Sequence, residues 1–252
     1  MKRVQLAAAG WAIGGALLVA AVYAASPPPP AGWAAAAVYL AVAHALLATG
    51  LRRRGATRFG QANVVTSLRS SLVGAITGLV VASFTAPIPV WMLVALIVPA
   101  LALDAVDGWV ARRTGSASDL GARYDMEVDA FLLLVLSAYV AADLGLWVLA
   151  IGALRYLFVM VGWALPWFRA QLPYRYWRKV ATAVAGIALA LAVAGTAPGV
   201  ELGAVGVAGV VVALGLLVES FGRDVVWLVV RRGAGVRGVS VPRATRRSNT
   251  TS

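Results

Sequence analysis

The chain has 252 residues, of which 61% are hydrophobic and 13% are charged, and its formal net charge is +12. Soluble domains are nearer half apolar and a quarter charged, so this composition excludes an ordinary soluble globular domain. Cysteine is absent and His44 is the only histidine. Disulfides, thiolate nucleophiles and multi-histidine metal sites are therefore excluded, and a Ser-His-Asp triad is disfavoured. Any chemistry must use carboxylates and cations.

Long apolar segments follow one another along the chain, and most approach the roughly 20 residues that a helix needs to cross a bilayer. Eight of them lie near residues 5–25, 32–50, 68–86, 90–110, 124–142, 146–166, 180–197 and 203–220. The sequence therefore predicts an all-α fold, a polytopic integral membrane helical bundle with about eight transmembrane helices.

The connections between these segments alternate in charge. Basic residues gather in residues 1–3, 51–58, 112–123 and 169–179 and in the tail from Arg223. The intervening loops, residues 26–31, 87–89, 143–145 and 196–203, contain no Lys or Arg. Because cytoplasmic loops of membrane proteins collect Lys and Arg, we expect a multi-pass protein of the cell membrane with both termini in the cytoplasm. The same clustering at helix ends argues against nucleic acid as a partner.

Three parts of the chain are expected from these patterns. Residues 1–59 would form two extra N-terminal transmembrane helices and a connector. Residues 60–232 would form a six-helix catalytic body. Residues 233–252 are rich in Gly, Ser, Thr and Arg and are expected to be a disordered basic tail that touches anionic membrane lipid.

Aspartates gather around the connection between the fourth and fifth segments. Asp104 and Asp107 are three residues apart and Asp125 and Asp129 are four apart, so each pair shares one face of its helix. The short connection makes the two helices antiparallel neighbours, and the four carboxylates should converge near the cytoplasmic interface. Charged groups inside a membrane span are costly and point to function. Their mutual repulsion is relieved by hard divalent cations with oxygen ligands, which favours Mg²⁺ or Mn²⁺.

The same region carries a longer pattern, D-x2-D-G-x2-A-R-x8-G-x3-D-x3-D. It is formed by Asp104, Asp107, Gly108, Ala111, Arg112, Gly121, Asp125 and Asp129. Without a mismatch, it resembles the signature of the CDP-alcohol phosphotransferases, also called CDP-alcohol phosphatidyltransferases. The resemblance covers about residues 60–230 and leaves the two N-terminal helices outside.

The resemblance implies a membrane enzyme of phospholipid biosynthesis. It would move a phosphatidyl group from CDP-diacylglycerol to an alcohol acceptor, release CMP and act as a homodimer. Asp104, Asp107 and Asp125 would be the principal ligands of a two-metal site. Asp129 would help to bind the second metal ion and act as general base on the acceptor hydroxyl.

The resemblance also implies a nucleotide site. Gly108, Ala111 and Gly121 would let the nucleotide approach the helices closely, and Arg112 would pair with phosphate or with a ligand carboxylate. Upstream, Asn63, Thr66 and Arg69 resemble the family's N-x2-T-x2-R stretch, and their spacing gives one polar helical stripe suited to the donor nucleotide. The alternative for this stripe is an interfacial arginine beside helix caps.

Two basic residues are expected to bind the acceptor. Arg155 lies in the middle of an apolar run, where it must face a cavity, a carboxylate or a phosphate. Lys179 and Thr182 resemble the K-x2-T of relatives that accept phosphorylated alcohols, although Ala185 stands where these relatives often have Gln. Inositol phosphate and glycerol 3-phosphate are therefore favoured, and serine or a free polyol stays open.

Some of the other charged residues are assigned to structure. Glu127 should point away from Asp125 and Asp129, and Glu219, Arg223 and Asp224 should pair locally. Two other functions fit the sequence less well. A divalent-cation transporter would explain the clustered acids but not the small residues and arginine at matching intervals, and a non-catalytic scaffold would have little reason to keep four mutually repelling aspartates.

Overall fold

The computed structural model describes residues 2–53, 61–113, 119–170, 172–173, 175–201 and 203–237. Within these ranges the side chains of residues 2–5, 8, 61–63, 105, 107–112, 119–120 and 233–237 are not described. The connector at 54–60 and the expected tail from residue 238 onward lie outside the described residues.

All regular structure in the described ranges is helical, which confirms the all-α prediction. The α-helices are α1 (Lys2–Ala25), α2 (Pro30–Arg53), α3 (Gln61–Ser83), α4 (Val90–Arg113), α5 (Asp119–Leu144), α6 (Leu149–Ala164), α7 (Tyr176–Gly195) and α8 (Gly203–Arg237). Short 3-10 turns, η1 (Leu146–Val148) and η2 (Pro166–Arg169), precede and follow α6. Each predicted apolar segment therefore corresponds to one helix.

Five of the described helical segments are long and apolar enough to cross a membrane. They are Pro30–Arg53, Val64–Ser83, Leu146–Ala164, Tyr176–Gly195 and Gly203–Arg232. The apolar stretches of α1 and α4, Ala9–Ala25 and Val90–Asp104, are shorter, and α5 carries Asp125, Glu127 and Asp129 near its start. The fold is a polytopic membrane bundle in which acidic residues interrupt the apolar character of the helices that carry the site.

Two helices extend beyond the ranges that hydropathy indicates. α3 begins at Gln61 rather than near residue 68, because its first turns are polar but still helical. α8 has 35 residues and continues through residues 233–237, which were expected to belong to the disordered tail. At 1.5 Å per residue such a helix is about 50 Å long, which exceeds a hydrocarbon core of about 30 Å. Hydropathy reports the surroundings of a helix, not where its backbone hydrogen bonding stops.

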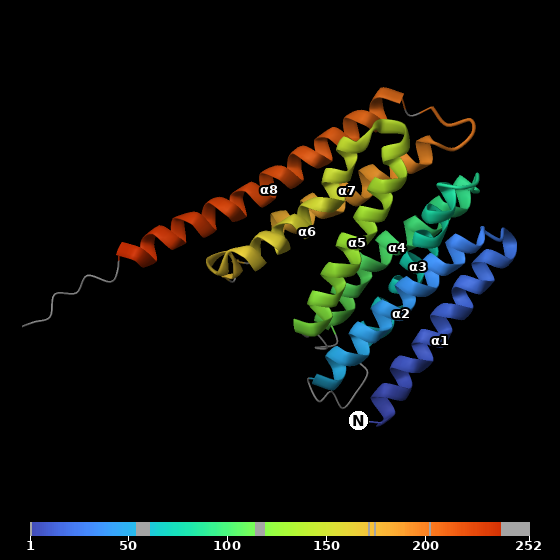
Figure 1. Cartoon of the computed structure of the whole chain (residues 1–252), viewed down its shortest axis with the longest axis horizontal. Coiled ribbons are helices and arrows are strands. Elements are labelled where there is room, and N and C mark those ends of the chain that lie inside the picture. Colours follow the sequence, from blue (N-terminus) through green and yellow to red (C-terminus); the bar gives the residue numbers. More distant parts are fainter. Residues whose placement is uncertain are drawn as a thin grey trace, which may run out of the picture.

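α3 is the central helix of the bundle. It packs against α1, α2, α4 and α5, and α7 packs against α4, α5 and α8 (Figure 1). α3 is also the most buried of the five candidate spans. Any polar side chain on its inner face must therefore find partners within the protein, because little lipid or water reaches it.

Glycines allow close contact at two helix crossings. An added Cβ on Gly152 of α6 would overlap the backbone of Leu134 on α5. An added Cβ on Gly32 of α2 would lie 2.8 Å from the carbonyl oxygen of Gly78 on α3. Small residues at such crossings let helix backbones approach each other within membranes. The positions of α2 and α6 against the central helices are therefore tightly defined.

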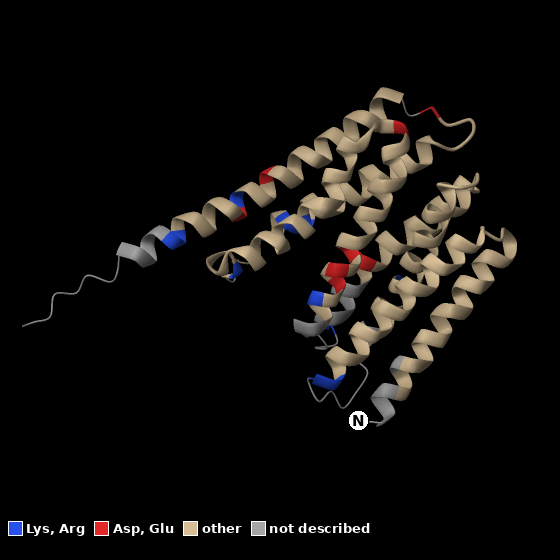
Figure 2. Ribbon diagram, in the orientation of Figure 1, with Lys and Arg blue, Asp and Glu red and all other residues tan. Residues whose placement is uncertain are grey.

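The described charges are distributed unevenly along the bundle (Figure 2). The connections from α1 to α2, α3 to α4, α5 to α6 and α7 to α8 contain no Lys or Arg in their described residues. Lys and Arg lie toward the opposite ends of these helices and in the chain between α6 and α7. The acidic cluster lies on α4 and α5, toward this basic end.

Candidate functional site

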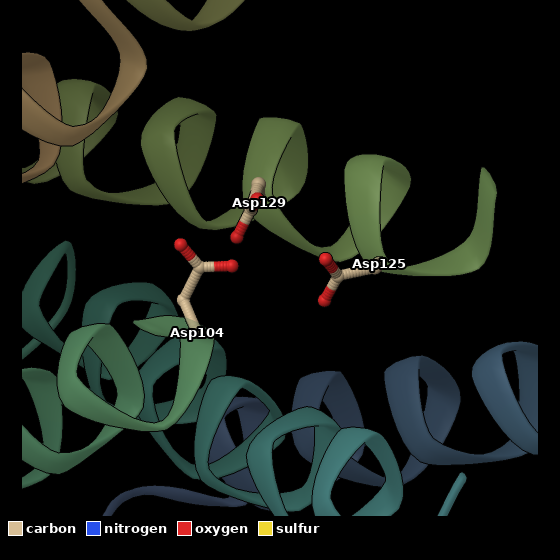
Figure 3. A group of neighbouring side chains, drawn as sticks. All are labelled: Asp104, Asp125 and Asp129. Atoms are coloured by element: carbon tan, nitrogen blue, oxygen red, sulfur yellow. The ribbon is translucent and has the colours of Figure 1, made fainter. Parts of the chain in front are cut away.

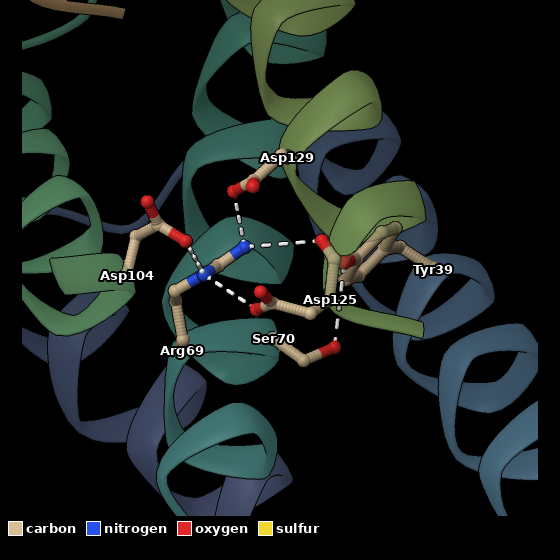
Figure 4. A network of polar contacts seen from close by, with 6 residues as sticks. All are labelled: Tyr39, Arg69, Ser70, Asp104, Asp125 and Asp129. Carbon is tan, nitrogen blue, oxygen red and sulfur yellow. Dashed lines mark hydrogen bonds and ion pairs between the residues drawn. The ribbon is translucent and has the colours of Figure 1, made fainter. Parts of the chain in front are cut away.

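A buried arginine joins three helices at the centre of the acidic cluster. The side chain of Arg69 on α3 is fully buried, and its Nη1 donates to Oδ1 of Asp104 and Oδ1 of Asp125, each at 2.8 Å. Its Nη2 donates to the backbone oxygen of Asp125 at 3.3 Å and to Oδ1 of Asp129 (Figure 4). One guanidinium therefore connects α3 with both α4 and α5.

The helices bring these residues together for simple geometric reasons. Asp125 and Asp129 are four residues apart near the start of α5, so they point from the same face. Asp104 lies toward the end of α4, which runs antiparallel to α5. Arg69 lies in the third turn of α3, at the same end of the bundle. An arginine inside a membrane bundle requires an anionic or carbonyl partner, and these carboxylates supply it.

The three described aspartates are close enough to share a metal ion. One carboxylate oxygen from each lies within 4.8 Å of the others (Figure 3). Their side chains are 41%, 28% and 26% exposed for Asp104, Asp125 and Asp129, whereas Arg69 is 0% exposed. Ligands can therefore reach the carboxylates from the side opposite the arginine.

The charge of the cluster also suits a divalent cation. If all three carboxylates are counted as ionised, they and the one guanidinium carry a formal charge of −2. Carboxylate oxygens are the hard ligands that Mg²⁺ and Mn²⁺ prefer, and each carboxylate offers two of them. The residues present therefore fit a divalent metal ion.

The other residues of the long aspartate pattern lie nearby on the same helices. Asp107, Gly108, Ala111 and Arg112 belong to the last turns of α4, but their side chains lie outside the described part of the chain. Gly121 lies one turn before Asp125 on α5. The structure thus shows three of the four predicted metal ligands together and leaves the fourth untested.

The polar stripe on α3 is described only in part. Thr66 is buried one turn before Arg69, and the side chain of Asn63 lies outside the described residues. Arg69 was expected to face the donor nucleotide, and in the structure its guanidinium contacts the carboxylates. The sequence feature that could have indicated this contact is the arginine within an apolar helix, because such a cation needs an anionic partner.

Sequence reasoning did not identify a set of hydroxyl groups beside this centre. Ser70 follows Arg69 and is fully buried. Its Oγ lies 3.3 Å from the hydroxyl of Tyr39 on α2 (Figure 4). The same Oγ lies 3.1 Å from the hydroxyl of Tyr124 on α5. No sequence motif links these three residues, because they come from three helices.

Arg155 does not reach the aspartate cluster in this structure but pairs with Glu127. Its Nη2 contacts Oε1 of Glu127, which joins α6 to α5. Glu127 thus points away from the three aspartates, as its position on the helix predicts. Arg155 also lines a cavity of about 460 Å³ together with Arg169, Phe158, Trp163 and Phe168. Lys179 is exposed in the first turn of α7 and is not among the described residues that line this cavity.

The predicted local pairing of Glu219, Arg223 and Asp224, which lie in the middle of α8, is correct for one pair and wrong for the third residue. Glu219 and Arg223 form an ion pair one turn apart, and Trp177 of α7 donates to Glu219 at 2.7 Å. Asp224 is buried and instead approaches Nε of Arg178 on α7 at 3.3 Å. Successive residues of a helix are rotated by about 100°, so Asp224 does not point toward Glu219 as Arg223 does. It pairs instead with Arg178 of α7.

Comparison with known families adds to this geometry. A family model for CDP-alcohol phosphatidyltransferases matches residues 59–221, which is more than half of the chain and includes α3 to α7 and part of α8. Searches of curated proteins and of solved structures find no match. The match confirms the resemblance carried by the aspartate pattern, and the chain belongs to the CDP-alcohol phosphatidyltransferase family.

Proposed function

We propose that this protein transfers a phosphatidyl group from CDP-diacylglycerol to an alcohol acceptor and releases CMP, as a step of phospholipid biosynthesis. Members of its family act on a CDP-alcohol and an alcohol acceptor. The observation that carries the proposal for this chain is the convergence of Asp104, Asp125 and Asp129 within 4.8 Å. Such a cluster beside a membrane-embedded helix core suits a reaction that handles a charged diphosphate on a lipid.

The proposed cofactor is Mg²⁺ or Mn²⁺ in a two-metal site held by Asp104, Asp107, Asp125 and Asp129. When bound, divalent ions at these carboxylates would stabilise negative charge on the diphosphate and on the departing CMP. Arg69 would keep the carboxylates together, since it contacts three of them at once.

Asp129 is the proposed general base. Its carboxylate would accept the proton of the acceptor hydroxyl while that oxygen attacks the phosphorus that carries the diacylglycerol. The bond from this phosphorus to the oxygen of CMP breaks, and the electron pair leaves with CMP. Asp129 is 26% exposed, so an acceptor hydroxyl can approach it.

The proposed nucleotide site surrounds the carboxylates on α3, α4 and α5. Its residues would be Asn63, Thr66, Arg69, Gly108, Ala111, Arg112 and Gly121. Helix surfaces with small residues allow a flat base to approach the backbone, and Arg112 offers a charged donor for phosphate. Because Arg69 contacts the carboxylates, its proposed effect on the nucleotide passes through them.

Arg155 and Lys179 are the proposed acceptor-binding residues, with inositol phosphate or glycerol 3-phosphate as the favoured acceptors. Arg155 and Arg169 both line the cavity of about 460 Å³, and arginines bind phosphate through paired charge-assisted hydrogen bonds. A phosphate would compete with Glu127 for Arg155. Serine and free polyols are the acceptors that this arrangement favours less.

A direct assay tests the proposed reaction. Purified protein is incubated with CDP-diacylglycerol, Mg²⁺ or Mn²⁺, and one of inositol phosphate, glycerol 3-phosphate, inositol or serine, and the released CMP and new lipid are identified. We expect metal-dependent CMP release with one phosphorylated acceptor and none in EDTA. Absence of CMP release with every acceptor would overturn the proposal, and nucleotide-independent metal uptake into proteoliposomes would support a divalent-cation transporter instead.

Replacing Arg155 with Gln should affect the acceptor selectively. Loss of charge-assisted hydrogen bonds is expected to raise the KM for the phosphorylated acceptor by about 10- to 100-fold, with little change in the KM for CDP-diacylglycerol. Arg223→Gln is the matched control, because Arg223 is exposed and pairs only locally with Glu219 among its described contacts. Equal KM values for the two variants would exclude Arg155 from acceptor binding.

We further propose a cell-membrane protein with the aspartate cluster and both termini facing the cytoplasm. The location of Lys and Arg at the cluster's end of the bundle supports this orientation. The division into residues 1–59, 60–232 and 233–252, with residues 233–237 continuing α8, and assembly as a homodimer are likewise proposals, the latter from the family resemblance.

A further inference from the structure

The two N-terminal helices lie outside the family match, which begins at residue 59, yet they contact the site helices. α1 and α2 both pack against α3, and α2 also touches α5. We propose that Tyr39 of α2 is a positioning residue for the carboxylate cluster, so that the N-terminal pair supports catalysis. This inference rests on the proposed function.

The hydroxyl of Tyr39 belongs to a chain of three hydroxyl groups that includes the sequence neighbours of Arg69 and Asp125. It lies 3.3 Å from Oγ of Ser70, and that Oγ lies 3.1 Å from the hydroxyl of Tyr124. Ser70 is adjacent to Arg69 in sequence, and Tyr124 is adjacent to Asp125. The three hydroxyl groups thus connect α2, α3 and α5 directly beside the residues that hold the charge.

The ring of Tyr39 contacts α5 at a second point. It stacks on Phe131 with ring centroids 4.9 Å apart and an angle of 26° between the planes. Phe131 lies two residues after Asp129, whereas Tyr124 lies one residue before Asp125. Tyr39 therefore contacts α5 directly after Asp129 and, through Ser70, just before Asp125.

The close packing of α2 on α3 fixes the position of Tyr39. An added Cβ on Gly74 of α3 would lie 3.2 Å from Cδ1 of Tyr39 and 3.1 Å from Cδ2 of Leu40. Rigid packing of Tyr39 matters because a misplacement of about 1 Å at a reacting group costs up to about 100-fold in rate. The buried hydroxyl of Tyr23 on α1 donates to the carbonyl oxygen of Ala75 on α3 at 2.8 Å, a bond that includes neither Tyr39 nor Ser70.

The test compares two matched tyrosine variants. Tyr39→Phe keeps the ring on Phe131 and removes the hydroxyl, and Tyr23→Phe removes the other hydroxyl that the N-terminal pair directs at α3. For Tyr39→Phe we expect kcat to fall by about three- to tenfold, because this factor corresponds to the usual free-energy contribution of one hydrogen bond. The Mg²⁺ concentration for half-maximal activity should rise, while the melting temperature and the KM for CDP-diacylglycerol stay close to wild type. Tyr23→Phe should leave kcat and the metal dependence unchanged.

Mn²⁺ binding measured by electron paramagnetic resonance on the purified protein separates this inference from the proposed function. Weaker Mn²⁺ binding by Tyr39→Phe than by both wild type and Tyr23→Phe supports positioning, even if wild type releases no CMP and the proposed function fails. Wild-type affinity together with wild-type kcat in Tyr39→Phe would overturn the positioning role, whatever the activity of the wild type. Equal losses in both variants with lowered melting temperatures would also overturn it, because they would show general stabilisation alone. Wild-type protein that binds no Mn²⁺ overturns the positioning role as well.

Discussion

Replacing Asp129 with Asn is expected to lower CMP release from CDP-diacylglycerol by about 10²- to 10⁴-fold, the usual contribution of a general base. The amide has nearly the size of the carboxylate and keeps one oxygen that can accept from Arg69. It cannot accept the proton of the acceptor hydroxyl, and it removes one negative charge from the cluster. The effect should therefore appear in kcat, while the variant stays folded.

The matched control for this experiment is Asp143→Asn. Asp143 lies on the same helix, α5, but near its other end and exposed. It should keep wild-type turnover, since it is far from the site aspartates along the helix. Steady-state CMP release and the melting temperature would be measured for both variants. Unchanged turnover in Asp129→Asn would contradict the assignment of Asp129 as base.

Replacing Arg69 with Ala should produce the largest loss of stability. The substitution leaves three carboxylates facing one another without the buried cation that contacts them. Breaking such a buried ionic network typically costs about 3–5 kcal/mol. In metal-free buffer we therefore expect a clear fall in the melting temperature of the detergent-solubilised protein.

Added Mg²⁺ should distinguish this loss from ordinary loss of packing. The formal charge of the cluster becomes more negative without Arg69, so a divalent cation should bind more tightly and raise the melting temperature of Arg69→Ala more than that of wild type. Arg123→Ala is the control, because Arg123 is exposed on α5 close to the site and surface charges contribute little. Equal Mg²⁺ responses in wild type and Arg69→Ala would show that Arg69 does not compensate the charge of the cluster.

The sequence predicted much of the fold and the central part of the site. Long apolar runs locate the helices, and the spacing of Asp125 and Asp129 with their short connection to α4 predicts that the carboxylates converge. These features depend on local periodicity and on one short loop, which a single sequence contains. The family match confirms the family resemblance that this pattern carries.

The contacts of Arg69 and Tyr39 depend on how the helices are rotated and placed against one another, which local sequence patterns do not specify. Tyr39 and Ser70 are 31 residues apart, and their contact requires a particular rotation and axial position of α2 on α3. Close approach at Gly32, Gly74 and Gly78 sets that position, and nothing in the local sequence near Tyr39 indicates it. The extension of α8 to Arg237 was missed for a related reason, since helix formation continues after hydrophobicity declines.

The guanidinium of Arg69 has a consequence for how the site would exchange the proposed metal ion. Without a nearby cation, the carboxylates would repel one another and separate each time a metal ion leaves. Each metal ion that binds would then have to bring them together again. A resident cation on three of them keeps the donor oxygens assembled through that interval. The same guanidinium competes with an incoming metal ion, so the affinity for metal should be lower than three carboxylates alone would give. Rebinding of a metal ion should then need no large rearrangement of the surrounding helices.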